Sequence, residues 1–302
     1  MKIFVTGGTG FVGRKLTKKL IGGGHTVTVL SRSGPKGTRV VQGIDYVDGD
    51  PTQEGAWQDS VANHDAVINL AGASIFTRWT RSARKRIRES RILTTTNLVH
   101  ALRDPQVMDI LFLSASAVGY YGFSEDGDLG ETAPPGEGFL AALSQEWEAA
   151  AIQAEKPGVR VALMRFGIVL GREGGALSMM RPLFRWRLAS PLGKGRQWFS
   201  WIHEEDLVKI FTHVLERRDI SGPVNCASPA PVQNNVFTKT MAEVMGRRTI
   251  FPAVPSFVVR AVLGEFGSVL LKGQKVLPKR LLAMDFAFQF PELRMALADL
   301  LL

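Results

Sequence analysis

The chain has 302 residues, of which 45% are hydrophobic and 22% charged, and its formal net charge is +9. This length and composition allow a substantial core, formed as one large domain or two unequal ones. No apolar run reaches the roughly 18 residues of a membrane span, so a membrane-embedded chain is excluded. The composition indicates an ordinary globular protein without a membrane partner.

Cysteine, histidine and basic residues narrow the class further. Cys226 is the only cysteine, which excludes an internal disulfide, and the start "MKIFVTGGTG" shows no signal peptide, so a cytoplasmic location is expected. The five histidines show no metal-ligand spacing, and no metal is predicted. The basic run "RWTRSARKRIRES" at 78–90 indicates a helix with one solvated face rather than a nucleic-acid site, because aromatic residues do not interleave with its charges.

Short β-rich runs alternate with helical stretches through the first half of the chain. In order, the predicted elements are "KIFVTG", a helix over 11–22, "TVTVLSR", "DYVDGD", a helix over 53–62, "DAVINLAG", a helix over 80–103 and "MDILFLSAS". A helix with "WEAAA" then leads to the strand "VRVALMRFG". This alternation predicts an α/β Rossmann fold, a doubly wound parallel sheet joined by right-handed crossovers.

The pattern changes at Gly171, where segments rich in Gly, Arg and Trp begin. "WIHEEDL" then opens a helix, "GPVNCAS" gives a last short strand, and the tail is helical with proline punctuation. We therefore expect residues 1–170 to form the Rossmann domain, with 197–228 returning to it. Residues 171–196 and 229–302 are expected to form a smaller, mostly helical C-terminal lobe.

The stretch "VTGGTGFVG" places three glycines at G-x-x-G-x-x-G spacing between the first strand and the first helix. Gly7 permits a tight turn, Gly10 lets the backbone approach a pyrophosphate, and Gly13 allows the helix to pack on the strand. The free N–H groups of the helix N-terminus then face the anion. The stretch therefore predicts a dinucleotide site formed by Gly7, Thr9, Gly10, Phe11, Val12 and Gly13.

The end of the second strand decides which dinucleotide is bound. An acidic residue there would bond a ribose 2′-hydroxyl, but this chain has Ser31 and Arg32. Because the arginine fork suits phosphate oxygens, the sequence favours NADP(H) over NAD(H), although Arg32 as an ordinary loop charge is the alternative.

Two later strand ends belong to the same expected site. Asp50 is a candidate acceptor for the adenine amino group, and Leu70, Ala71 and Gly72 are candidates for a small wall beside the cofactor. Both stretches also fit plain strand and turn.

The motifs "TGGTGFVG", "INLAG", "LSASAVGYYG", "LMRFGIVLG", "WIHEEDL" and "GPVNCAS" occur in the order of the extended, epimerase-like branch of the short-chain dehydrogenase/reductase superfamily, which the chain resembles. It is still more similar to an atypical subgroup, the SDR39U-like or YfcH-like epimerase family proteins, through "GGALSMMRPLF", "GKGRQWFSWIH" and "GQKVLPKRLL". The resemblance implies bound NADP(H) and a small C-terminal domain of unassigned role. Asp285 departs from the subgroup, where glycine is expected, and is interpreted as a tolerated turn residue.

The resemblance also implies a catalytic serine, tyrosine and lysine, of which only the serine, Ser116, is present. Phe139 or Leu140 stands in the place of the tyrosine, and Leu143 or Ser144 in the place of the lysine.

Tyr120 and Tyr121 follow Ser116 at the carboxyl end of a central strand, where open α/β sheets bind ligands, and are the candidate proton donors. Without the lysine such a phenol donates a proton better than it accepts one, which favours reduction. The alternative is that both rings pack the pocket without chemistry.

Several further residues are candidates for ligand contacts. Through the resemblance, Arg91 and the neighbouring Arg86 are possible phosphate contacts, and Val169 and Ser114 are possible cofactor contacts. Lys194 and Arg196 are possible contacts for an anionic substrate, with solvated loop charge as the alternative.

His203 and Asp206 are not expected to form a catalytic dyad, because Asp206 begins a helix and is expected to cap it or to bond the backbone.

Two functions are favoured over a third and weaker one, a polyanion-binding protein that uses the basic helix at 78–90. The first is an NADP(H)-dependent oxidoreductase or epimerase-like enzyme on a small carbonyl or sugar-like substrate. The second is a non-catalytic NADP(H)-binding redox reader or scaffold, favoured by the missing tyrosine and lysine. Neither the substrate nor the oligomeric state follows from these residues.

Overall fold

The computed structural model of the chain describes residues 1–32, 41–103, 109–125, 127–156, 158–247 and 252–302. Its centre is a seven-stranded sheet in which every pair of neighbouring strands is parallel. Across the sheet the strands are β10 (Gly222–Cys226), β6 (Val159–Phe166), β5 (Ile110–Ala117), β4 (Ala66–Asn69), β1 (Lys2–Thr6), β2 (Thr26–Ser31) and β3 (Ile44–Asp48). From β1 the chain adds β2 and β3 on one side of the sheet and then returns to add β4, β5, β6 and β10 on the other side. Because the strand order reverses in this way between β1 and β4, the predicted doubly wound Rossmann fold is confirmed.

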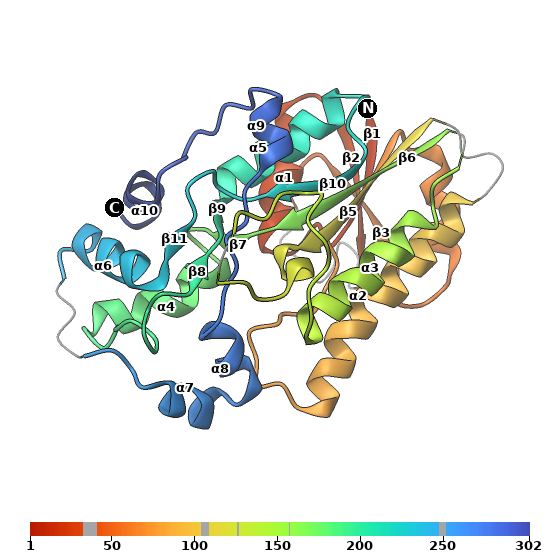
Figure 1. Cartoon of the computed structure of the whole chain (residues 1–302). Coiled ribbons are helices and arrows are strands. Elements are labelled where there is room, and N and C mark those ends of the chain that lie inside the picture. Colours follow the sequence, from red (N-terminus) through yellow and green to blue (C-terminus); the bar gives the residue numbers. More distant parts are fainter. Residues whose placement is uncertain (33–40, 104–108, 126, 157, 248–251) are drawn as a thin grey trace.

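Helices cover both faces of this sheet and give three layers (Figure 1). On one face lie α1 (Phe11–Gly22) and α5 (Glu204–Glu216), and on the other lie α2 (Arg81–Leu102), α3 (Phe139–Ile152) and the 3-10 helix η2 (Ala56–Asn63). Leu16 of α1 and Phe211 of α5 are fully buried in one core cluster, and Leu98 of α2 and Ala151 of α3 in the other. The two clusters hold the sheet between them.

The predicted elements of the first half are found, with one difference. The helix expected over 11–22 is α1 with the same bounds, and the helix expected over 80–103 is α2. The helix expected over 53–62 is found as the 3-10 helix η2, which begins three residues later and in which the Gln58 N–H donates to the Gly55 carbonyl.

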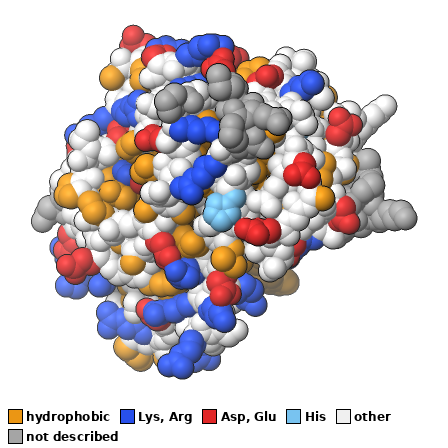
Figure 2. Space-filling model, turned by 90° about the vertical axis from the view of Figure 1, so that its right-hand side faces the viewer, with side chains coloured by type: hydrophobic (Ala, Val, Ile, Leu, Met, Phe, Trp, Pro, Cys, Tyr) orange, Lys and Arg blue, Asp and Glu red, His pale blue; other side chains and the backbone are white. Residues whose placement is uncertain are grey.

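The basic run at 78–90 forms the start of α2 with the expected solvated face. Ala83 and Ile87 are buried, while Arg88 and Lys85 are exposed and pair with Glu146 and Glu89. Figure 2 shows Lys and Arg side chains gathered toward the lower end of this face, at the height where Figure 1 places the first turns of α2. Acidic side chains are interspersed on the same face.

A smaller lobe contains helices and short strand pairs. Its elements are β7 (Ile168–Leu170), β8 (Trp198–Phe199), β9 (Trp201–His203), β11 (Val232–Gln233), α4 (Gly175–Arg185), α6 (Asn234–Val244), α7 (Ser256–Leu263), α8 (Glu265–Leu270), α9 (Lys279–Ala283) and α10 (Leu293–Leu301). Phe199 and Trp201, which we expected in the Rossmann part, pack in one core cluster with Phe237 of α6 and Leu297 of α10. The division at 170, 196 and 228 stays a prediction.

The C-terminal segment is fastened to the Rossmann domain by buried carboxylates. Asp206 accepts hydrogen bonds from the backbone N–H groups of Gln289 at 2.6 Å and Phe290 at 2.9 Å, which confirms the expectation that it bonds backbone.

Asp285 ends the turn after α9 with φ 53°, a left-handed conformation that glycine adopts most easily.

Among the helices that the described residues form, none is both long enough and apolar enough to cross a bilayer.

Candidate functional site

The glycine-rich turn joins β1 to α1 with the predicted geometry. Gly7 has φ 70°, and the N–H of Gly10 donates to the Gly7 carbonyl at 2.9 Å. A Cβ on Gly13 would lie 2.2 Å from the Gly7 oxygen, and a Cβ on Gly7 would lie 2.7 Å from the Leu70 carbonyl carbon. The first turn of α1 holds no acidic residue. The turn is therefore a cradle without side chains at a helix N-terminus, the form that suits a pyrophosphate.

A crevice opens where the strand order reverses, and buried polar groups fix its floor. Thr6 of β1 donates to Asn69 of β4 at 2.8 Å, and Asn69 in turn donates to Thr95 of α2 at 2.9 Å. Trp147 of α3 donates to the same Thr95 oxygen at 2.9 Å. This chain of hydrogen bonds sets the ends of β1 and β4 against α2 and α3, at the place where doubly wound folds bind dinucleotides.

A cavity of about 590 Å³ extends from this crevice to the smaller lobe. Its Rossmann wall includes Phe11, the Leu70–Gly72 stretch predicted as a cofactor wall, Arg91 and Val169. Its far wall is formed by α8 and the stretch after it, residues 265–274. The cavity therefore brings six of the predicted cofactor residues together and adds a wall that no sequence motif indicated.

Arg91 of α2 contacts the loop that follows β4, at Gly72 and Ala73. Its Nη1 donates to the carbonyls of Ala73 and Ile87 at 3.0 Å each, and a Cβ on Gly72 would lie 3.1 Å from its guanidinium carbon. Burial lowers the pKa of Arg91 to about 10, and it forms no ion pair with any described residue. A cation without a carboxylate at the cavity wall suits a phosphate oxygen.

The residues expected on the adenosine side lie at the ends of β2 and β3. Ser31 is buried and Arg32 is exposed at the last described position before 33–40, which lie outside the described residues. One oxygen of Asp50 accepts from the Thr52 N–H at 2.9 Å and from the Thr52 hydroxyl at 2.8 Å. Asp50 therefore closes a turn, which leaves its second oxygen for the predicted adenine contact.

Ser116 lines the cavity, but its proton is already engaged. The hydroxyl donates to Glu148 of α3 at 2.6 Å, and Arg165 of β6 donates to both carboxylate oxygens of Glu148 at 2.7 Å. Although burial opposes the charge, these bonds to Glu148 raise the pKa of Arg165. Because the Ser116 hydroxyl points its hydrogen at Glu148, Ser116 offers the cavity lone pairs rather than a donor.

The tyrosine pair lies behind this ion pair and does not line the cavity. The Tyr121 hydroxyl donates to Asn225 at 2.7 Å and accepts from Arg165 at 2.8 Å, while the Arg165 guanidinium lies 3.6 Å from the centre of the Tyr120 ring. Burial raises the pKa of Tyr121. The structure therefore does not bring Tyr120 and Tyr121 together with Ser116 at the cavity, and it does not support either as the proton donor.

The segment expected to hold a tyrosine and a lysine does line the cavity. Phe139, Leu140, Leu143 and Ser144 of α3 all contribute to its wall. The departure from the family pattern therefore lies at the cavity itself, where three apolar side chains and a serine stand in the region of the expected tyrosine and lysine.

The remaining predicted contacts divide into two groups. Val169 lines the cavity, whereas the Ser114 hydroxyl is fully buried within β5 without a partner among the described residues. Arg86 is exposed on α2 and away from the cavity. Lys194 and Arg196 are also exposed, although Leu192 and Gln197 of the same loop line the cavity.

His203 is a buried structural residue. Its Nδ1 accepts from the Glu205 N–H at 3.1 Å at the start of α5, and its ring lies 3.9 Å from that of Phe290. This arrangement agrees with the rejection of a catalytic dyad with Asp206.

Sequence reasoning missed two features of the site. The loop 171–175 closes on Phe11, because Cβ atoms on Gly171 and Gly174 would lie 2.2 and 2.3 Å from its ring. The run "GREGG" was the available signal, since glycines in a loop allow close approach. The ion pair of Glu148 with Arg165 left no signal, because the two side chains meet only across α3 and β6.

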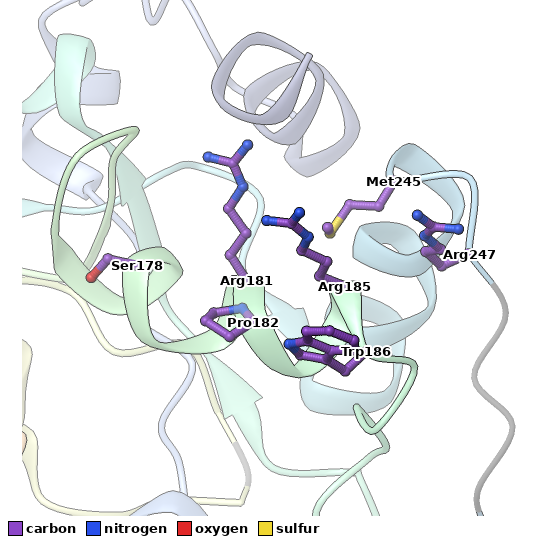
Figure 3. Close-up of a pocket in the computed structure, with 7 residues that line it drawn as sticks. All are labelled: Ser178, Arg181, Pro182, Arg185, Trp186, Met245 and Arg247. Atoms are coloured by element: carbon purple, nitrogen blue, oxygen red, sulfur yellow. The ribbon is translucent and has the colours of Figure 1, made fainter.

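A second hollow of about 620 Å³ lies on the outside of the smaller lobe, between α4 and the end of α6 (Figure 3). Arg181, Arg185 and Arg247 line it with exposed side chains beside Trp186, which is 73% exposed. It shares no residue with the cavity at the glycine-rich turn. We interpret it as a solvated basic surface.

Comparisons with known proteins agree with this geometry. Residues 3–227 match the model of the NAD dependent epimerase/dehydratase family, and residues 254–300 match a domain of unknown function, DUF1731. The chain is 40% identical to the chloroplastic epimerase family protein SDR39U1 homolog of Arabidopsis thaliana, over 98% of this chain and 86% of that protein. It is 38% identical to the epimerase family protein YfhF of Bacillus subtilis, over 100% of this chain and 98% of that protein.

Among solved structures, the human epimerase family protein SDR39U1, crystallised with NADPH, is 37% identical and superposes with a TM-score of 0.86 over 99% of each chain.

Proposed function

The chain belongs to the NAD dependent epimerase/dehydratase family, and from this premise we propose that it is an NADP(H)-dependent oxidoreductase or epimerase-like enzyme acting on a small carbonyl or sugar-like molecule. The observation that carries the proposal is the cradle at Gly7 and Gly13, which opens into a cavity with an unpaired Arg91 on its wall. The NADPH in the related human structure supports the choice of cofactor.

The residues present fit such a cofactor. The glycine cradle would hold the pyrophosphate, Leu70, Ala71 and Gly72 would lie beside it, and Arg32 would meet the 2′-phosphate. Bound NADPH would supply a hydride to a carbonyl carbon of the substrate. Ser116, whose hydroxyl donates to Glu148, would accept a hydrogen bond from a substrate hydroxyl.

Calorimetry with the two reduced cofactors tests the cofactor. We expect NADPH to bind more tightly than NADH, and Arg32→Ala to weaken NADPH binding about tenfold to a hundredfold, the effect of losing about 1.5 to 3 kcal/mol of charge-assisted hydrogen bonding. Lys18→Ala removes an exposed charge from α1 and should bind as the unmodified chain does. Equal affinities for the two cofactors would contradict the assignment of Arg32.

A carbonyl-substrate screen with NADPH tests the chemistry, followed by single substitutions. We expect Ser116→Ala to lower turnover. Because the Tyr121 hydroxyl is held by Asn225 and Arg165, we expect Tyr121→Phe to lower stability more than turnover, whereas loss of a proton donor would lower the rate about 10² to 10⁴-fold. A loss of that size in Tyr121→Phe with intact cofactor affinity would restore the tyrosine as the donor.

The second candidate function is a non-catalytic NADP(H)-binding redox reader or scaffold. Phe139 and Leu140 favour it, because they put apolar side chains at the positions of α3 where the family pattern has a tyrosine. Tight NADPH binding without turnover of any carbonyl in a broad screen would make it the better description. In either case we propose a small-molecule ligand and a cytoplasmic location, which rests on the single cysteine.

A further inference from the structure

The half of the cavity that faces the smaller lobe is predominantly aromatic. Trp79, Phe139 and Phe266 form a cluster in which the Trp79 ring centre lies 5.0 Å from that of Phe139 and 5.7 Å from that of Phe266. Phe76 meets Phe266 edge to face at 6.0 Å. All four side chains line the cavity. Such a wall favours flat apolar groups by burial and by ring contacts.

Most polar side chains around the cavity are engaged in holding its loops together. Gln197 donates to the carbonyls of Leu192 and Leu270 at 3.1 Å each, and Gln274 donates to the Val118 carbonyl at 3.1 Å. A sugar needs many hydrogen-bond partners when it leaves water, and these side chains have few left to offer.

Two more polar side chains of the wall are committed in the same way. Ser200 donates to the Gln274 carbonyl at 2.7 Å, and Glu265 is ion-paired with Arg84. Glu137 and Lys272 also line the cavity but are exposed, which places them where it opens to solvent. The interior is therefore left with few polar groups.

Ser144 differs from the others. Its side chain is buried, with the residue 3% exposed, it lines the cavity, and its hydroxyl has no hydrogen-bond partner among the described residues. A Cβ on Gly119 would lie 3.8 Å from the Ser144 oxygen, so the absence of a side chain at Gly119 keeps the space beside this hydroxyl open. Unlike the Ser114 oxygen, the Ser144 oxygen is not shut off from solvent, so a ligand in the cavity can reach this hydroxyl and accept its hydrogen bond.

We propose that Ser144 is a substrate-binding residue, whose hydroxyl donates a hydrogen bond to the carbonyl oxygen of a flat, predominantly apolar ketone or aldehyde held by Trp79, Phe139 and Phe266. Ser116 and Ser144 are then complementary: the first offers lone pairs, and the second offers a proton for hydrogen bonding. The inference rests on the proposed function for its carbonyl chemistry, but it concerns binding and can be tested without turnover.

The test compares two probes of nearly equal shape, 2-acetylnaphthalene and 2-ethylnaphthalene, of which only the first has a carbonyl. Their affinities are measured by fluorescence titration in the free chain and in the chain saturated with NADP⁺, which cannot reduce a ketone. We expect Ser144→Ala to weaken binding of the ketone about three- to tenfold, the effect of one neutral hydrogen bond, and to leave the hydrocarbon unchanged. Because no described residue is hydrogen-bonded to the Ser144 side chain, the variant should unfold at the same temperature as the unmodified chain.

Ser268→Ala is the matched control, since Ser268 of α8 also lines the cavity and should leave both affinities unchanged. The proposal is overturned if Ser144→Ala weakens both probes equally, or if only Ser268→Ala lowers affinity for the ketone. It is also overturned if neither probe binds while a nucleotide sugar, tested as UDP-glucose, binds tightly. Failure of NADP⁺ to bind would instead contradict the proposed function, because the titrations in the free chain still report on Ser144.

Discussion

Neutralising Glu148 should destabilise the fold strongly, because its ion pair with Arg165 is buried. The two side chains are 5% and 4% exposed and are joined by two hydrogen bonds of 2.7 Å. In Glu148→Gln the guanidinium keeps its charge and its burial but loses the opposing carboxylate. Breaking a buried pair from one side typically costs about 3 to 5 kcal/mol, a large share of the roughly 5 to 15 kcal/mol by which domains are stable.

The measurement is urea unfolding followed by circular dichroism, without nucleotide. Glu146→Gln is the control on the same helix: its pair with Arg88 is exposed, so it should cost at most about 1 kcal/mol. The double variant Glu148→Gln with Arg165→Met removes both charges and should be more stable than Glu148→Gln alone. If Glu148→Gln costs no more than Glu146→Gln, the reasoning from burial is refuted.

Three further predictions concern single positions. Gly13→Ala should abolish measurable NADPH binding in a fluorescence titration, since its Cβ would lie 2.2 Å from the Gly7 oxygen; Gly22→Ala, with nothing within 4 Å, should bind normally. Asp285→Gly should raise the free energy of unfolding by about 0.5 to 1 kcal/mol, because φ is 53° there. Burial lowers the pKa of His203 below its ordinary 6.5, so the unfolded chain binds the proton first and stability falls as the pH drops below 6.5. This fall should be smaller in His203→Asn, which can still cap α5.

Each of these has a contradicting result. Normal NADPH binding by Gly13→Ala would show that the turn can move; a less stable Asp285→Gly would mean that the aspartate side chain outweighs the backbone strain. A pH dependence unchanged in His203→Asn would assign the loss of stability to other histidines, of which the half-buried His64 also has a lowered pKa.

The sequence by itself determined the parts of this protein that depend on neighbours along the chain. The turn at Gly7 and the bounds of α1 follow from residues within one strand and one helix, and the doubly wound sheet follows from the alternation of elements with crossovers of fixed hand. That Asp206 bonds backbone was expected from its place at the start of a helix, but its partners, the N–H groups of Gln289 and Phe290, lie far along the chain and were decided by the tertiary structure.

The tertiary structure decided which polar groups reach the cavity. Ser116 and Tyr121 are close together in the chain, yet their hydroxyls bond residues from different distant elements. The hydroxyl of Tyr121 meets Asn225, 104 residues away, and that of Ser116 meets Glu148. Ser144, one of the two residues in the place of the expected lysine, keeps a hydroxyl without a hydrogen-bond partner among the described residues. Hydrogen bonds and burial depend on distances across the fold, and these are fixed only when strands and helices from distant parts of the chain pack together.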